Sequence, residues 1–144
     1  MNDFDQEPND GSYQDLGSED LWVGEESSGP TRDKSRKFAL SVISLYQEMV
    51  NAREFVISKQ LLRSGTSIGA NVEEAIAAES RRDFLHKMTI ASKEARESVY
   101  WLGLLEESRL VADLDVQPHL EQANELVRLL TSIVKTTKQS ISRR

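Results

Sequence analysis

Apolar residues recur every three or four positions along most of the chain after residue 32, which is the spacing of one buried face of an α-helix. The pattern predicts four helices, over about 33–51, 53–79, 81–109 and 116–140. No segment alternates apolar and polar residues as a half-buried strand does. Four helices joined by short turns predict an all-α fold, an antiparallel up-down four-helix bundle.

The apolar stripes of the four predicted helices together form the predicted core. Its members are Phe38, Val42, Leu45 and Met49; Ile57, Leu61, Ile68, Val72 and Ile76; Phe84, Met88, Ala91, Ala95, Val99 and Leu102; and Leu120, Ala123, Val127, Leu130 and Val134. Gly65 and Gly69 add small positions to the second predicted helix. Since helix axes come closer where the contacting side chains are small, we expect tight packing there.

Three local signals place the predicted helix ends. Ser80 and Asp83 have the spacing of a capping box, which predicts that Ser80 begins the third helix. Asn51 is a candidate left-handed residue at the end of the first helix. Pro118 falls in the first turn of the fourth helix, where its missing N–H costs nothing.

The net charge of −6 is an average over two unlike parts of the chain. Residues 1–30 carry nine acids and no Lys or Arg, whereas residues 31–144 carry the other 15 acids and all 18 basic residues, a net charge of +3. The first part lacks apolar periodicity, so we predict a disordered acidic tail over 1–30 and a bundle over 31–144. Leu21-Trp22-Val23 within the tail is either a linear docking motif or part of a loosely self-packing segment.

The residue types available argue against catalysis. The chain has no cysteine and two histidines, and only Asp83-x-x-His86 approaches the Glu-x-x-His spacing of di-iron bundles. A Gly-rich phosphate loop and a Ser nucleophile motif are both missing. We therefore expect no enzyme activity, no metal and no cofactor. No signal-peptide pattern or membrane-length apolar run occurs, so a cytoplasmic location is expected.

The two middle helices are each predicted to have a second face suited to contact. On the third helix, Ile90, Trp101 and Leu104 lie nearly opposite the core stripe, beside Glu94 and Glu97. A monomeric bundle would leave these large apolar residues in water. The second helix carries a stripe of small or weakly charged residues away from its core, made of Arg63, Ser67, Asn71 and Glu74. These nine residues predict a homo-oligomer interface, with Arg63 paired to Glu94 or Glu97 across or within it; a solvated face with scattered apolar residues is the alternative.

Basic residues gather in three places along the chain, and phosphate binding needs such clusters. The nucleic-acid candidates are Arg36, Lys37, Arg81, Arg82, Lys87, Lys135 and Lys138. Basic helix ends are also ordinary capping and solubility features, so this alternative stays open.

The run Gln60-Leu61-Leu62-Arg63-Ser64-Gly65-Thr66-Ser67-Ile68-Gly69-Ala70-Asn71-Val72-Glu73-Glu74-Ala75 resembles the signature of the four-helix bundle proteins of the 23S rRNA intervening-sequence family. Asp83-Phe84, Lys87, Ile90-Ala91, Glu94-Ala95 and Tyr100-Trp101-Leu102 continue the resemblance in order. It implies a small bacterial protein related to the accessory variability determinant protein of diversity-generating retroelements, a pentameric barrel that binds nucleic acid and its reverse transcriptase. The resemblance therefore implies a ring, with a pentamer favoured, and an RNA or a reverse-transcriptase-type protein as partner. The acidic tail is not part of the family pattern.

Two functional hypotheses follow. The first is a cytoplasmic, non-enzymatic homo-oligomeric bundle that acts as an RNA- or ribonucleoprotein-associated binding module. The second is a protein–protein adaptor whose acidic tail carries the docking motif around Trp22.

Overall fold

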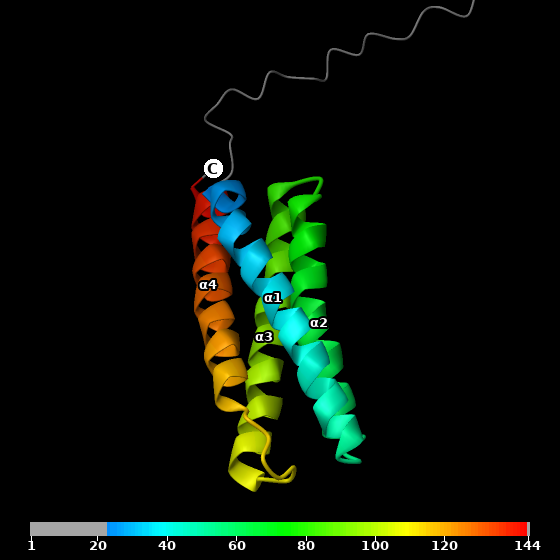
Figure 1. Cartoon of the computed structure of the whole chain (residues 1–144). Coiled ribbons are helices and arrows are strands. Elements are labelled where there is room, and N and C mark those ends of the chain that lie inside the picture. Colours follow the sequence, from blue (N-terminus) through cyan, green and yellow to red (C-terminus); the bar gives the residue numbers. More distant parts are fainter. Residues whose placement is uncertain (1–22, 144) are drawn as a thin grey trace, which may run out of the picture.

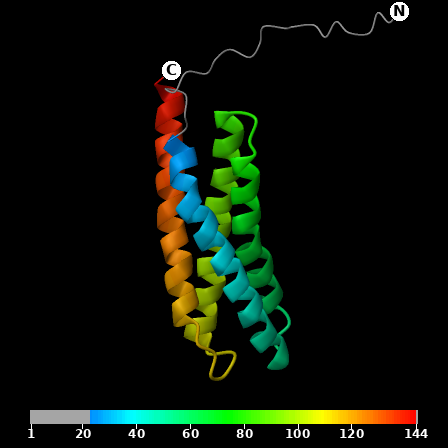
Figure 2. The same ribbon diagram turned by 45° about the horizontal axis from the view of Figure 1, so that its top comes forward.

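The computed structural model describes residues 23–143 and contains four helices, which confirms the predicted all-α bundle. They are α1 (Val23–Asn51), α2 (Ile57–Ile76), α3 (Arg81–Ser108) and α4 (Gln117–Ser142). Successive helices run in opposite directions, so α1 begins and α4 ends at the same end of the bundle (Figure 1). Helices α1 and α3 each pack against both α2 and α4. Figure 2 shows α1 crossing the other helices obliquely, from beside the end of α4 towards the start of α2.

The predicted core is confirmed over α1 to α3 with few exceptions. Phe38, Val42, Leu45 and Met49 are fully buried, as are most of the predicted residues of α2 and α3. Ile76 is 37% exposed, and its neighbour Ala75 is buried in its place. Val99 is half-buried, and Ser98 beside it is fully buried.

The prediction of the core face of α4 is wrong, because the buried side of the helix is rotated by part of a turn from the predicted one. Its buried residues are Ala123, Leu126, Leu130, Ile133 and Thr137. Leu120, Val127 and Val134 are only half-buried at the edge of the core. Helix α4 carries two adjacent apolar stripes, and the position of α1 and α3 decides which one points inward. That information lies outside the sequence of α4 itself.

Helix α1 begins ten residues before its predicted start and contains Pro30. The part of the predicted tail from Val23 to Pro30 is therefore helical, and the prediction of disorder is wrong there. Thr31 and Ser35 are buried, so packing against the neighbouring helices favours helix over the local Gly29-Pro30 sequence. The rest of the predicted tail, with Leu21 and Trp22 of the candidate docking motif, lies outside the described residues.

The turn between α1 and α2 is built differently from the prediction. Arg53, with a φ of 64°, takes the left-handed conformation that was predicted for Asn51. The carboxylate of Glu54 then accepts backbone N–H bonds from Val56 at 3.0 Å, Ile57 at 2.9 Å and Ser58 at 2.7 Å. Glu54 thus satisfies N–H groups that have no partner within the first turn of α2. Helix α2 therefore starts at Ile57 rather than at about residue 53.

The signals predicted for the starts of α3 and α4 are confirmed. Ser80 is the N-cap of α3, and its hydroxyl accepts the N–H of Asp83 at 3.1 Å. The carboxylate of Asp83 reaches back one residue further than in a standard capping box, to the N–H of Glu79 at 3.2 Å. Pro118 lies in the first turn of α4, as predicted.

Candidate functional site

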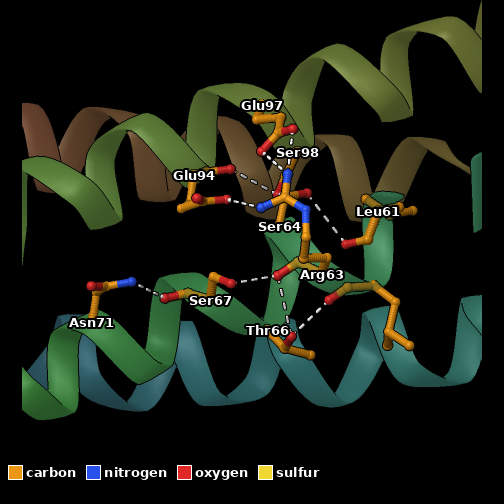
Figure 3. Close-up of polar contacts among 10 residues, drawn as sticks. Leu61, Arg63, Ser64, Thr66, Ser67, Asn71, Glu94, Glu97 and Ser98 are labelled. Carbon is orange, nitrogen blue, oxygen red and sulfur yellow. Dashed lines mark hydrogen bonds and ion pairs between the residues drawn. The ribbon is translucent and has the colours of Figure 1, made fainter. Parts of the chain in front are cut away.

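The nine predicted interface residues lie on α2 and α3, which are joined where Arg63 contacts Glu94 and Glu97, and together they define a candidate surface. We call this surface, defined by Arg63, Ser67, Asn71, Glu74, Ile90, Glu94, Glu97, Trp101 and Leu104, the α2–α3 face. At its centre Arg63 reaches across to α3 (Figure 3). Its Nη2 lies 2.5 Å from both carboxylate oxygens of Glu97, and its Nη1 lies 3.5 Å from Oε2 of Glu94. The predicted partners of Arg63 are thus found within one protomer.

The polar side chains of Ser67 and Asn71 on this face form hydrogen bonds to backbone carbonyls one turn earlier in α2. Ser67 donates its hydroxyl to the carbonyl of Arg63 at 2.6 Å, and Asn71 donates its amide to the carbonyl of Ser67 at 2.8 Å. Such bonds to a preceding carbonyl keep the side chains close to the helix surface. The side chains of Ser67 and Asn71 therefore lie close along α2, between the exposed charged groups of Arg63 and Glu74.

Glu94 and Glu97 respond to this environment in opposite ways. Burial raises the pKa of Glu94, and the neighbouring Glu97 carboxylate raises it further against the attraction of Arg63. Burial also opposes ionisation of Glu97, but hydrogen bonds from Arg63 and Glu94 outweigh it, so the pKa of Glu97 is lowered. The three groups form a coupled unit with one cation for two carboxyl groups.

Two buried polar atoms on the α2–α3 face have no hydrogen-bond partner among the described residues, Oε2 of Glu94 and Nε1 of Trp101. The indole N–H lies near enough to Glu97 to help lower the pKa of that carboxyl group, but it lacks the geometry of a hydrogen bond. Because nearly all buried polar atoms in proteins form hydrogen bonds, these two atoms have capacity for a further hydrogen-bond partner, although Oε2 of Glu94 already forms the ion pair with Arg63.

The expectation that a single bundle would leave Ile90, Trp101 and Leu104 in water is wrong. All three are half-buried, and Trp101 packs against the edge of its own core. A long side chain can lean into the groove between two helices, which a helical wheel does not represent. The most exposed apolar side chain near this face is instead that of Tyr100, which is 58% exposed. Its ring packs edge-on against that of Trp101, with 5.0 Å between the ring centroids.

A pair of buried serines joins α2 to α3 beneath this face. The hydroxyl oxygens of Ser64 and Ser98 lie 3.0 Å apart, and both residues are fully buried (Figure 3). The hydroxyl groups also bond to the carbonyls of Leu61 and Glu94. Sequence reasoning did not identify this pair, although two serines at apolar positions of neighbouring helices were the available signal.

The up-down order of the helices collects the predicted nucleic-acid residues in one half of the bundle. Eleven Lys or Arg and five Asp or Glu occur in residues 29–47, 64–93 and 129–143. By contrast, six Lys or Arg and ten Asp or Glu occur in residues 48–63 and 94–128. We call the first group of segments the basic half and the second the acidic half. Figure 1 shows the first part of α1, the end of α2, the start of α3 and the end of α4 meeting in the basic half.

Within the basic half the seven candidates differ in their exposure to solvent and in their contacts with other side chains. Five are exposed: Arg36, Lys37, Arg82, Lys135 and Lys138. Arg81 is half-buried and donates to the hydroxyl of Ser140 at 3.2 Å. Lys87 forms an ion pair with Glu74 of the α2–α3 face at 2.9 Å, which raises the pKa of Lys87.

The described residues offer no group of three His, Cys, Asp or Glu side chains that could hold a metal ion. His86 is exposed on α3. His119 lies near Ser41 on the other side of the bundle, where burial lowers its pKa. In the same part of the chain, every helix is too short or too polar to cross a membrane.

Comparison with known proteins agrees with this architecture. Residues 31–132 match the model of the family described as 23S rRNA-intervening sequence protein. The chain is also similar to the crystal structure of a protein of unknown function from the S23 ribosomal protein family of Bacteroides thetaiotaomicron, with a TM-score of 0.72 and 45% identity. That match covers 76% of this chain and 98% of the other. No curated protein matches. The chain belongs to the 23S rRNA-intervening sequence protein family.

Proposed function

We propose that this protein is a non-enzymatic, homo-oligomeric bundle that binds RNA or an RNA–protein particle through its basic half. The observation that carries the proposal is the gathering of three basic clusters, distant in sequence, at one part of the folded chain. Phosphate neutralisation by Lys and Arg releases counterions and supplies most of the affinity for nucleic acid that does not depend on base sequence. The family description names a 23S rRNA intervening sequence, and a ribosomal RNA partner would place the protein in the cytoplasm.

The α2–α3 face supports the oligomeric part of the proposal. A neighbouring copy that covers this face could supply an acceptor for Nε1 of Trp101 and a donor for Oε2 of Glu94, the two buried atoms that form no hydrogen bond within the described chain. The family resemblance favours five copies in a ring. A ring would also compensate for the modest net positive charge of one bundle, because several weak sites on one assembly bind a long RNA far more tightly than one site does.

The RNA proposal is tested by filter binding of a structured RNA at two salt concentrations, using the full chain. We expect retention that falls steeply as salt rises. The double substitution Arg36→Glu with Lys37→Glu should weaken binding by roughly tenfold or more and should flatten the salt dependence. Both residues are exposed, so the fold should be unaffected.

The matched control is Arg53→Glu with Lys59→Glu, which makes the same charge change at two exposed residues of the acidic half. This variant should bind RNA within about threefold of the parent, because its substitutions lie away from the proposed surface. Equal losses in the two variants would show that only net charge matters. An absence of salt-dependent retention by the parent would reject RNA binding and leave the adaptor hypothesis.

A further inference from the structure

A hollow of about 330 Å³ lies on the surface between α3 and α4. Its lining combines three cations, two hydroxyl groups and one apolar side chain, and contains no acid: Ser92, Arg96, Thr131, Val134, Lys135 and Lys138. Nη2 of Arg96 donates to the hydroxyl of Thr131 at 3.2 Å, which holds the guanidinium group at the rim. Arg96 was not among the residues singled out from the sequence.

The cations of this hollow differ from four basic residues that link neighbouring helices elsewhere in the bundle. Arg32, Lys34, Arg63 and Lys87 each form an ion pair with a carboxylate of a neighbouring helix. Within the described chain, Arg96, Lys135 and Lys138 form no ion pair. Bringing like charges together around one concave surface is unfavourable unless an anion binds there, so the hollow has the electrostatic character of an anion site.

The charges continue along the seam beyond the hollow. Arg81 at the start of α3 donates to Ser140 near the end of α4, which places it on the same seam. From Thr131 to Ser140 the α4 axis advances roughly 14 Å, at about 1.5 Å per residue. A single small anion would occupy only part of that length. A linear polyanion can contact the hollow and the end of the seam together.

We propose that the α3–α4 hollow binds backbone phosphates of RNA, with Arg96, Lys135 and Lys138 as the phosphate-binding residues. This inference rests on the proposed function and names a site at the edge of the basic half, where Arg96 of the neighbouring acidic half lines the same hollow as Lys135 and Lys138. The guanidinium group of Arg96 can donate two parallel hydrogen bonds to one phosphate, whereas the two lysines act as point charges. The hydroxyl groups of Ser92 and Thr131 can donate to phosphate oxygens, and Val134 offers an apolar contact for a ribose.

A second hollow provides an internal contrast. It has a volume of about 420 Å³ and lies at the turn between α3 and α4, where Glu106, Asp113 and Asp115 outnumber Arg109 among its charged lining residues. Its negative character would repel RNA. The two hollows border the same pair of helices, yet only the one nearer the end of α4 has the charge that phosphate requires.

The experiment measures binding of a fluorescent 12-nucleotide oligouridylate to the full-length chain at several salt concentrations. Lys135→Gln with Lys138→Gln should lower affinity by roughly tenfold and reduce the slope of log affinity against log salt by about 1.4, since each single-strand phosphate contact contributes about 0.7. Arg96→Gln should reduce the slope by about 0.7. Lys135→Arg with Lys138→Arg keeps the charges and should keep both affinity and slope.

The matched control is Arg53→Gln with Lys59→Gln, which removes two exposed charges at the turn between α1 and α2 and should leave the slope unchanged. If the parent binds and the Lys135→Gln, Lys138→Gln variant keeps the parental slope, the hollow is not the phosphate site, although the RNA proposal survives. If the parent does not bind the oligouridylate, the hollow proposal fails, and if it also retains no structured RNA on the filter, both proposals fail. If polyglutamate at equal charge displaces the RNA as well as unlabelled RNA does, the surface selects acidic polymers in general and the assignment to RNA is overturned.

Discussion

Gly65 faces Val42 across the seam between α1 and α2. A Cβ built on Gly65 would lie 2.9 Å from Cγ1 and 3.0 Å from Cγ2 of Val42, closer than two carbon atoms can stay. Val42 is fully buried and β-branched, so it has little freedom to move aside. At Gly69, one turn later, the added atom would be 3.6 Å from the carbonyl oxygen of Ser35, an ordinary contact.

The two glycines therefore predict opposite effects of the same substitution. Gly65→Ala should destabilise the protein by about 1–3 kcal/mol through overpacking, reduced by the helix propensity that alanine gains. Gly69→Ala should leave stability unchanged or raise it by up to about 1 kcal/mol. Urea denaturation followed by circular dichroism measures both. Similar free energies of unfolding for the two variants would show that α1 and α2 can separate without cost.

The carboxyl groups bound by Arg63 give a second prediction at the scale of single residues. The pKa of Glu94 is raised, so its ionisation opposes folding, and the free energy of unfolding falls as pH rises from about 4.3 through the folded-state value. The pKa of Glu97 is lowered, so its contribution is present above about pH 4.3 and is lost as pH falls through the folded-state value.

At pH 7, Glu94→Gln should therefore raise the free energy of unfolding, whereas Glu97→Gln should lower it by up to about 1 kcal/mol, as for a half-exposed ion pair. Thermal unfolding at pH 4 and pH 7 measures the contrast, which should shrink at the lower pH. Destabilisation by Glu94→Gln at pH 7 would contradict the assignment. The sequence sufficed to pair Arg63 with these residues, but the difference between the two glutamates depends on burial, which needs the fold.

At the scale of elements, helix ends were predictable where the cap used a familiar residue. Ser80 is a common N-cap type and was identified from the sequence. Glu54 is not, so the start of α2 was placed too early. The core face of α4 shows a different limit, since Leu126 and Leu130 share the helix with a competing stripe of Leu120, Val127 and Val134, and only the packed bundle selects between them.

The cap at Glu54 predicts an acid-sensitive start of α2. Burial works against its ionised form, but the backbone hydrogen bonds from Ile57, Ser58 and Val56 dominate and lower the pKa of Glu54. This stabilisation is present above about pH 4.3 and is lost as pH falls through the folded-state pKa. Glu54→Ala should cost about 1–2 kcal/mol at pH 7, the usual cost of losing an N-cap.

The measurement for Glu54→Ala is urea denaturation at pH 7 and at pH 3, where the difference from the parent should diminish. Glu107→Ala removes an exposed acid from the end of α3 and serves as the control, with an expected change within about 0.5 kcal/mol. An equal loss of stability at both pH values would mean that the side chain of Glu54 stabilises the turn by packing rather than by its charge.

At the scale of the whole molecule, the sequence contained the basic clusters but not their common location. Their gathering follows from the antiparallel order of four helices, which places the start of α1 and α3 beside the end of α2 and α4 (Figure 1). The sequence also indicated nine residues for an interface. It could not show that Trp101 leans towards its own core, because that depends on how closely α2 approaches α3.

The proposed assembly predicts a mass above that of the 16.3 kDa chain in sedimentation equilibrium at micromolar concentration. Ser67→Arg with Asn71→Arg places two bulky charges on the outer stripe of α2 without altering the core, and should yield monomers. Ser44→Arg with Gln47→Arg makes a similar change on the exposed side of α1 and should leave the assembly intact. A monomeric parent protein would remove the ring from the proposal while leaving the fold untouched.

The even number of antiparallel helices also determines the position of a tag or label joined to the start of α1 or the end of α4. Helix α1 begins at Val23 and α4 ends at Ser142 beside the basic half, so an affinity tag joined directly to either end of the bundle is anchored next to the surface proposed for RNA. A tag of that kind can obstruct or mimic a ligand in a binding assay. The two turns of the acidic half, near Arg53 and Asp113, are the better places for a fluorophore or an inserted epitope, because they lie at the opposite pole.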